Sequence, residues 1–116
     1  MTTTSYTQLT NDISASLSPF RKTQAETMRG FGALSQAAMA AGAIDAKTKE
    51  LIAMGIGVAA RCDGCIGFHA KALVRLGATQ QELEEVLGVA VYMGGGPSLM
   101  YAANALAAFK EFSATA

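Results

Sequence analysis

Apolar residues recur along this chain at the three- and four-residue spacing of helices rather than in the two-residue alternation of strands. The first stripe follows Ser18 and Pro19, a suitable N-cap residue and a proline suited to the first helical position. Its apolar or small members are Phe20, Ala25, Met28, Phe31 and Leu34. Gly30 and Gly32 weaken this helix and could divide it. The alanine-rich continuation is expected to stop at Gly42.

Two more helices are expected around the middle of the chain. Asp45 can cap the first of them, whose apolar run contains Gly55 and Gly57. Each glycine costs about 1 kcal/mol in an exposed helix, so the pair indicates close packing against another helix. Residues 61–64 interrupt the pattern and begin a new helix, which Gly77 ends.

The last two helices also carry recognisable start signals. Thr79 followed by Glu82 has the spacing of a capping box. The glycines at 94–96 predict a turn, after which Pro97 opens a final helix that continues through Phe109. No strand-like runs stand in a hairpin arrangement. The sequence therefore predicts an all-α bundle of five to six helices.

Length and composition extend this picture to the whole molecule. The 116 residues are enough for one domain, expected over residues 18–116 after a flexible lead-in at residues 1–17 that is rich in Thr and Ser. Hydrophobic residues make up 51% of the chain and charged residues 16%. A small domain cannot bury so large an apolar share, and exposed surplus commonly marks an interface. We expect a homo-oligomer.

Charge and hydropathy argue against two classes of partner. Nine basic and nine acidic residues cancel without forming a local basic cluster, so no nucleic-acid partner is expected. The start of the chain lacks the basic and apolar regions of a signal peptide. The longest apolar run, 51–60, is about half of the ~20 residues that span a bilayer. We expect a soluble cytoplasmic protein with no membrane partner.

Chemistry-bearing residues gather in one stretch of twenty, ELIAMGIGVAARCDGCIGFH, between Glu50 and His69. In a helix starting at Cys62, the residues Cys62, Cys65 and His69 share one face. Both thiols then lie near a helix N-terminus, which stabilises thiolates, and they are close enough to form a short disulfide. His69 can exchange protons near neutral pH. In a reducing cytosol, such a pair is more often redox-active, catalytic or metal-binding than a permanent crosslink.

Other interpretations of these residues stay open on the pattern alone. Glu50 could be a general base at the edge of an apolar bundle, but first-turn acids are commonly structural. Zinc would need about four ligands, which Cys62, Cys65, His69 and Glu50 could supply. Structural zinc sites more often use a second Cys/His pair, which this sequence lacks. By the helix dipole alone, Cys62 is the more acidic thiol.

The spacing of Glu50, Cys62, Cys65 and His69 resembles that of the AhpD-like alkylhydroperoxidases of the carboxymuconolactone decarboxylase superfamily. The resemblance covers about residues 20–110, including HAKALVRLGAT after the cysteines and the LEEVLGVAVYMGGGPSLMYAANAL segment. It implies an all-helical, trimeric or hexameric protein. One position departs from the pattern, because Gly64 stands where better-studied peroxidase members carry a second histidine.

The resemblance also implies a role for each residue. Cys65 would attack the hydroperoxide, Cys62 would resolve it as an intramolecular disulfide, and Glu50 and His69 would relay protons. No bound cofactor is implied; an external dithiol, such as a lipoyl-bearing protein, would reduce the disulfide. Two rival functions remain: a decarboxylase-type lactone enzyme, which does not need the cysteine pair, and a non-enzymatic redox-sensing oligomer.

Overall fold

The structure is a computed structural model that describes residues 5–116. Within those residues the secondary structure is entirely helical, which confirms the predicted all-α fold. The six helices are α1 (Tyr6–Thr23), α2 (Ala25–Met39), α3 (Ala46–Ala59), α4 (Asp63–Arg75), α5 (Gln80–Gly94) and α6 (Gly96–Ala114). None of them is long and apolar enough to cross a bilayer.

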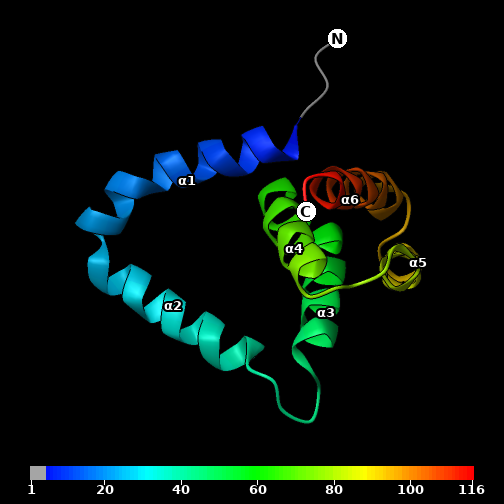
Figure 1. The fold of residues 1–116 in the computed structure, drawn as a ribbon, viewed down its shortest axis with the longest axis horizontal. Coiled ribbons are helices and arrows are strands. Elements are labelled where there is room, and N and C mark those ends of the chain that lie inside the picture. The colour runs from blue at the N-terminus through cyan, green and yellow to red at the C-terminus, as the bar shows by residue number, and fades with distance from the viewer. Residues whose placement is uncertain (1–4) are drawn as a thin grey trace.

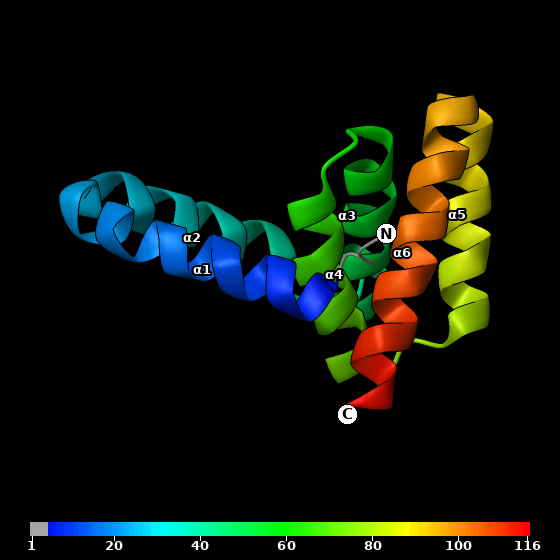
Figure 2. The ribbon, with the colours of Figure 1, turned by 90° about the horizontal axis from the view of Figure 1, so that it is seen from above.

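Helices α3 to α6 pack into a bundle, whereas α1 and α2 form a helical hairpin that projects from one side of it (Figures 1 and 2). The radius of gyration is 14.6 Å, whereas a compact domain of this length would have about 13 Å. The projecting hairpin accounts for this difference. We call α1 and α2 together the arm.

The hydrophobic core lies among α3, α4, α5 and α6, and the only arm residue in it is Tyr6. Its fully buried larger side chains come from three of these helices: Met54, Val58, Ile66, Leu73 and Leu83. Alanines on α6 let that helix approach the others closely, and three of them have at most 5% exposure: Ala102, Ala105 and Ala108. This core holds α3 and α4 against each other, and these two helices carry the candidate site.

The N-terminal region differs from the sequence expectation. Of the expected lead-in at residues 1–17, residues 1–4 lie outside the described residues, and residues 6–17 are not flexible but form most of α1. The first turn of α1 is capped by the Ser5 side chain and anchored by the buried Tyr6. The helix start expected at Ser18 and Pro19 is also wrong, because α1 continues through Pro19 and ends before Gln24. The polar composition misled the prediction, since the charges and contacts that order this helix come from α4 and α6.

Most other helix boundaries follow their local signals. The Asp45 side chain accepts a hydrogen bond from the Thr48 amide at 2.7 Å, and Thr79 and Glu82 form a complete capping box. Gly77 has a φ of 75°, a left-handed conformation that suits glycine after a helix. The last helix is longer than expected, because it continues to Ala114 rather than Phe109.

Candidate redox site

The site begins at the sharp reversal between α3 and α4. Arg61 has a φ of 59°, the only left-handed non-glycine residue within residues 5–116. Its amide donates to the carbonyl of Val58 at 3.1 Å, and the amide of Cys62 donates to that of Gly57 at 3.0 Å. These two bonds form the usual hydrogen-bond pattern of a helix C-terminus. The reversal places Cys62 directly at the start of α4.

Cys62 and Cys65 form a disulfide within the first turn of α4, with their Cα atoms 5.2 Å apart. Cys62 is the N-cap residue of this helix and has an extended backbone. Its Sγ accepts a hydrogen bond from the Cys65 amide at 3.2 Å. The amide would also stabilise negative charge on that sulfur after reduction, in the way that helix N-termini lower thiol pKa values.

Two glycines of α3 allow close approach by neighbouring helices, as their sequence context predicted. A Cβ on Gly57 would lie 3.3 Å from the Cβ of Cys65, and one on Gly55 would lie 3.2 Å from Val86. Such distances are tighter than most Cβ contacts. Gly57 therefore lets the cysteine turn of α4 pack directly on α3.

Glu50 and His69 come together from α3 and α4. The Oε2 atom of Glu50 lies 2.6 Å from the Nδ1 atom of His69, and the side chains are 14% and 32% exposed. This contact fixes the imidazole orientation and directs its second nitrogen away from the carboxylate. His69 follows Cys65 by four residues, so both lie on the same side of α4. Within residues 5–116, no three His, Cys, Asp or Glu side chains converge as metal ligands would.

Helix α1 packs against the first turns of α4, where the two cysteines lie. A Cβ on Gly64 would lie 2.9 Å from the Cδ1 of Ile13, and one on Gly67 would lie 2.7 Å from the Cγ2 of Thr10. Gly64, where the family resemblance would place a second histidine, is therefore packed against an isoleucine. A larger residue at 64 would require Ile13 to move.

Asp63, between the two cysteines, is part of a hydrogen-bond network that the sequence analysis missed. Its Oδ1 accepts from the hydroxyl of Tyr6 at 2.8 Å and from the amide nitrogen Nδ2 of Asn104 at 3.2 Å. Burial, followed by the bond to Asp63, raises the pKa of Tyr6, so the phenol remains a donor. The donors come from α1 and α6, so no local sequence signal identifies them.

The arrangement unites a redox-capable sulfur pair with a carboxylate–imidazole pair at the junction of two helices. A disulfide can accept two electrons from a dithiol, and the imidazole can transfer a proton to or from a reacting group nearby. The four predicted residues therefore form two bonded pairs: Cys62 and Cys65 at the start of α4, and Glu50 of α3 with His69 of α4.

Comparisons with known proteins find similarity to one protein family. The sequence model of the carboxymuconolactone decarboxylase family matches residues 25–108. An uncharacterised protein of Cupriavidus necator is 40% identical over 114 residues, which cover 98% of this chain and all of that protein.

Two solved structures of carboxymuconolactone decarboxylase family proteins share the fold. That of Legionella pneumophila is 61% identical, with a TM-score of 0.92, and covers 93% of this chain and 96% of that one. One from Thermotoga maritima, for which an antioxidative role has been suggested, is 30% identical with a TM-score of 0.71. It covers 77% of this chain and 92% of that one.

Proposed function

Because the chain belongs to the carboxymuconolactone decarboxylase family, we propose that it is a thiol-dependent peroxidase and disulfide oxidoreductase that reduces alkyl hydroperoxides. The observation that carries this proposal is the Cys62–Cys65 disulfide, formed one helical turn before a histidine that is paired with a carboxylate. The suggested antioxidative role of the Thermotoga relative is in keeping with it. A decarboxylase of the same superfamily would have no need of the two sulfurs.

The reaction starts from the reduced pair. The thiolate of Cys65 attacks the terminal oxygen of the hydroperoxide; an S–O bond forms, the O–O bond breaks, and the alkoxide leaves with a proton as an alcohol. The thiolate of Cys62 then attacks the sulfenic sulfur of Cys65. The disulfide forms and the sulfenic oxygen leaves as water after protonation. The peroxide has been reduced by two electrons and the dithiol oxidised by two.

Glu50 and His69 supply and remove the protons in these steps. With Glu50 bound at Nδ1, the other imidazole nitrogen is free to accept a thiol proton and to return it to the leaving oxygen. The negative carboxylate stabilises the imidazolium that forms between these two events. The imidazole thus holds each proton only between its removal from a thiol and its delivery to an oxygen.

An external dithiol completes the cycle by thiol–disulfide exchange. Its first sulfur attacks the disulfide and makes a mixed disulfide, and its second sulfur releases the protein in the dithiol form. A lipoyl-bearing protein fits this requirement, because each dihydrolipoyl group carries two thiols at the end of a long flexible side chain. No cofactor needs to stay bound to the chain.

The central test is steady-state consumption of cumene hydroperoxide with dihydrolipoamide as the reductant. We expect Cys62→Ser and Cys65→Ser each to lower dithiol-dependent turnover by about 100-fold or more, and Glu50→Gln by about 10- to 100-fold. The exposed Glu85 offers a matched control, and Glu85→Gln should retain parental activity. If the double serine variant consumes peroxide as fast as the parent, the proposal is wrong.

The roles of the two cysteines need a separate experiment. The family resemblance assigns attack to Cys65, whereas the amide bonded to the Cys62 sulfur favours a thiolate there. Peroxide treatment followed by sulfenic-acid trapping should label Cys62→Ser, which keeps Cys65. Labelling of only the Cys65→Ser variant would exchange the two roles. A peroxide-dependent change of assembly without turnover would instead favour a redox sensor.

A further inference from the structure

Two acceptors compete for one backbone amide at the start of α4. The amide of Cys65 donates to the Sγ atom of Cys62 at 3.2 Å. The competing acceptor is Asp63, the first residue of α4. Aspartate side chains commonly accept a hydrogen bond from the amide two residues later, and for Asp63 that amide belongs to Cys65. An aspartate that took this bond would leave the Cys62 sulfur without its donor.

The Asp63 carboxylate is instead held by two other helices. Its Oδ1 atom accepts from the hydroxyl of Tyr6 on α1 at 2.8 Å and from the Nδ2 atom of Asn104 on α6 at 3.2 Å. Tyr6 is only 5% exposed, so water competes little for its hydroxyl. Asp63 and Cys65 are two positions apart and therefore point about 200° apart around α4. The carboxylate is bound on the α1 and α6 side, whereas the Cβ atom of Cys65 lies close to Gly57 of α3.

The position of this negative charge matters once the disulfide is reduced. A thiolate at Cys62 is stabilised by the Cys65 amide and by the positive end of the helix dipole. A carboxylate that turned towards the same amide would take the donor from the sulfur and bring a second negative charge to it. Both effects favour the protonated thiol over the thiolate. The bonds from α1 and α6 prevent them by holding the carboxylate elsewhere.

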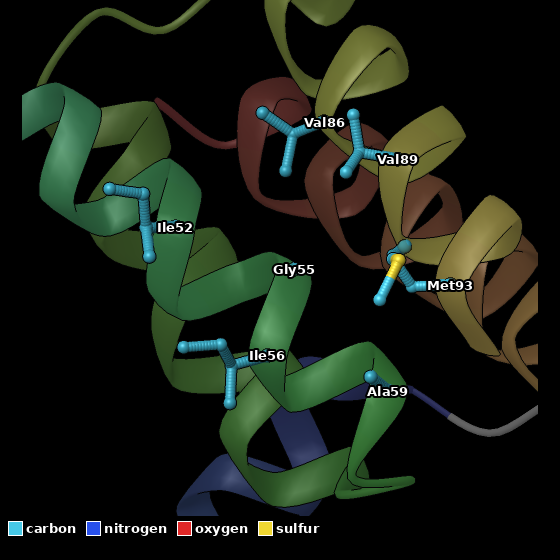
Figure 3. Close-up of a pocket in the computed structure, with 8 residues that line it drawn as sticks. Ile52, Gly55, Ile56, Ala59, Val86, Val89 and Met93 are labelled. Atoms are coloured by element: carbon cyan, nitrogen blue, oxygen red, sulfur yellow. The ribbon is translucent and has the colours of Figure 1, made fainter.

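Other charged and titratable groups also lie around the cysteine turn. Besides Tyr6 and Asp63, they come from α1, α3, α4, α6 and the reversal: Asp12, Glu50, Arg61, His69, Tyr101 and Glu111. The groove between α3 and α5, in contrast, has an uncharged lining that includes Ile52, Ile56 and Met93 (Figure 3). All these groups are the same in the variants below, so a difference between the variants reports the contacts of Asp63.

We propose that Tyr6 and Asn104 are positioning residues for the redox pair. By binding Asp63, they leave the amide of Cys65 to donate to the sulfur of Cys62, and this contact favours the thiolate at that sulfur. The inference rests on the proposed function, because a Cys62 thiolate is the group that closes the disulfide in that reaction. Tyr6 thereby makes the start of the arm part of the chemistry of the bundle.

Alkylation of the reduced protein by iodoacetamide tests this role, because the thiolate and not the thiol is the nucleophile. Mass spectrometry locates the product at Cys62. The pH of half-maximal alkylation rate should rise by about 0.5–1 in Tyr6→Phe and in Asn104→Ala, and should fall by about 0.3 or more in Asp63→Asn. The rates of all variants should converge at high pH, where every thiol is ionised. Tyr92→Phe is the matched control, because Tyr92 is 84% exposed on α5, and should react like the parent.

A double variant shows whether Tyr6 acts through Asp63. With asparagine at position 63 there is no carboxylate charge to hold, so adding Tyr6→Phe to Asp63→Asn should move the half-maximal pH by less than about 0.2. An equal rise in both backgrounds would overturn the proposal. Slower alkylation at every pH would also overturn it, because that result reports lost access to the sulfur. Circular dichroism checks folding, and if Tyr6→Phe does not fold, Asn104→Ala in the same two backgrounds decides, since alanine favours helices.

No peroxide enters this experiment, so the positioning role and the peroxidase activity can fail separately. A parent protein that consumes no peroxide but shows these pH shifts would refute the activity and support the positioning role. An active parent with the same half-maximal pH in Tyr6→Phe and Asn104→Ala would refute only the positioning role.

Discussion

Asp63 shows how a single residue connects the site to distant parts of the chain. It lies between the two cysteines, yet the groups that hold it are Tyr6 and Asn104, 57 and 41 positions away. The other titratable groups that act on Tyr6 are Tyr101 and Glu111 of α6. Because an anion near a sulfur disfavours the thiolate, the balance between Asp63 and its donors should affect the redox equilibrium of the pair.

Two substitutions should shift this equilibrium in opposite directions. Asp63→Asn removes the negative charge, so the thiolate form is stabilised and the reduction potential rises. Tyr6→Phe removes a donor but leaves the charge, so the potential falls. We expect shifts of up to about tenfold in the equilibrium constant, or ~30 mV, measured by equilibration with a glutathione buffer. Equal shifts in one direction would indicate simple loosening of the turn instead.

At the scale of elements, α1 determines how the start of α4 is packed. Its side chains meet two glycines of α4, Gly64 and Gly67, and its first turn is bound to α6. The N-terminal amides of Tyr6 and Thr7 donate to the Glu111 carboxylate at 3.0 and 2.7 Å, and the hydroxyl of Ser5 donates at 2.9 Å. The first part of the arm is thus part of the site's scaffold.

The contact between α1 and α4 can be tested at Gly67. Gly67→Ala places a Cβ 2.7 Å from the buried Thr10, so we expect it to lower the free energy of unfolding by about 1–3 kcal/mol. Gly88→Ala is the control, because nothing lies within 4 Å of the added carbon in the middle of α5. That change should raise stability by about 0.5–1 kcal/mol, since alanine favours helices. Urea unfolding followed by circular dichroism measures both; equal effects would refute the close contact.

The attachment of α1 to α6 should depend on pH. Hydrogen bonds, first from Thr7 and also from Tyr6 and Ser5, lower the pKa of Glu111 to about 2. A lowered pKa in the folded state means that this carboxylate stabilises the fold above its ordinary pKa and ceases to do so as pH falls towards 2. We expect Glu111→Gln to lower the free energy of unfolding by about 1 kcal/mol at pH 7, as for other lost helix caps.

Unfolding curves of the parent and Glu111→Gln across the pH range provide the check. The difference in free energy of unfolding should be constant from about pH 5 to 7, because Glu111 has its ordinary pKa in the unfolded chain. It should shrink between about pH 4.5 and 2, as the carboxylate becomes protonated. A difference that does not change with pH would show that the charge of Glu111 contributes nothing.

At the scale of the whole molecule, the projecting arm and the bundle both leave large apolar side chains exposed, among them Phe31 on α2 and Met93 on α5. Exposed apolar surface of this kind commonly marks an interface, and the homo-oligomer expected from the composition stays a prediction.

If copies of the chain assemble, stability must depend on protein concentration. Association that only the folded state can make stabilises that state by mass action. We therefore expect the midpoint of thermal unfolding to rise by several degrees between 1 and 100 µM, on the order expected for a stabilisation of ~1–2 kcal/mol. Phe31→Glu places a charge on an exposed apolar side chain and should weaken the dependence. Differential scanning calorimetry across this range measures it, and a constant midpoint in the parent would contradict assembly.

The sequence by itself determined the helical class and most helix boundaries, and it singled out the four candidate residues that the structure joins in two pairs. Caps such as Asp45 and the Thr79–Glu82 box act within one turn, so their signal is complete in a few neighbouring residues. The spacing from Glu50 to His69 likewise lies within two adjacent helices. Local chemistry of this kind can be interpreted without coordinates.

Only the tertiary structure decided what lies around that site. The ordering of residues 6–17, the packing of Ile13 on Gly64 and the donors to Asp63 all depend on contacts between segments far apart in the chain. Phe31 is a further example. Its place in the apolar stripe of the helix predicts a buried side chain, but in the fold that side chain is exposed. Periodicity tells which residues share a face; the fold alone selects the surface that each face meets.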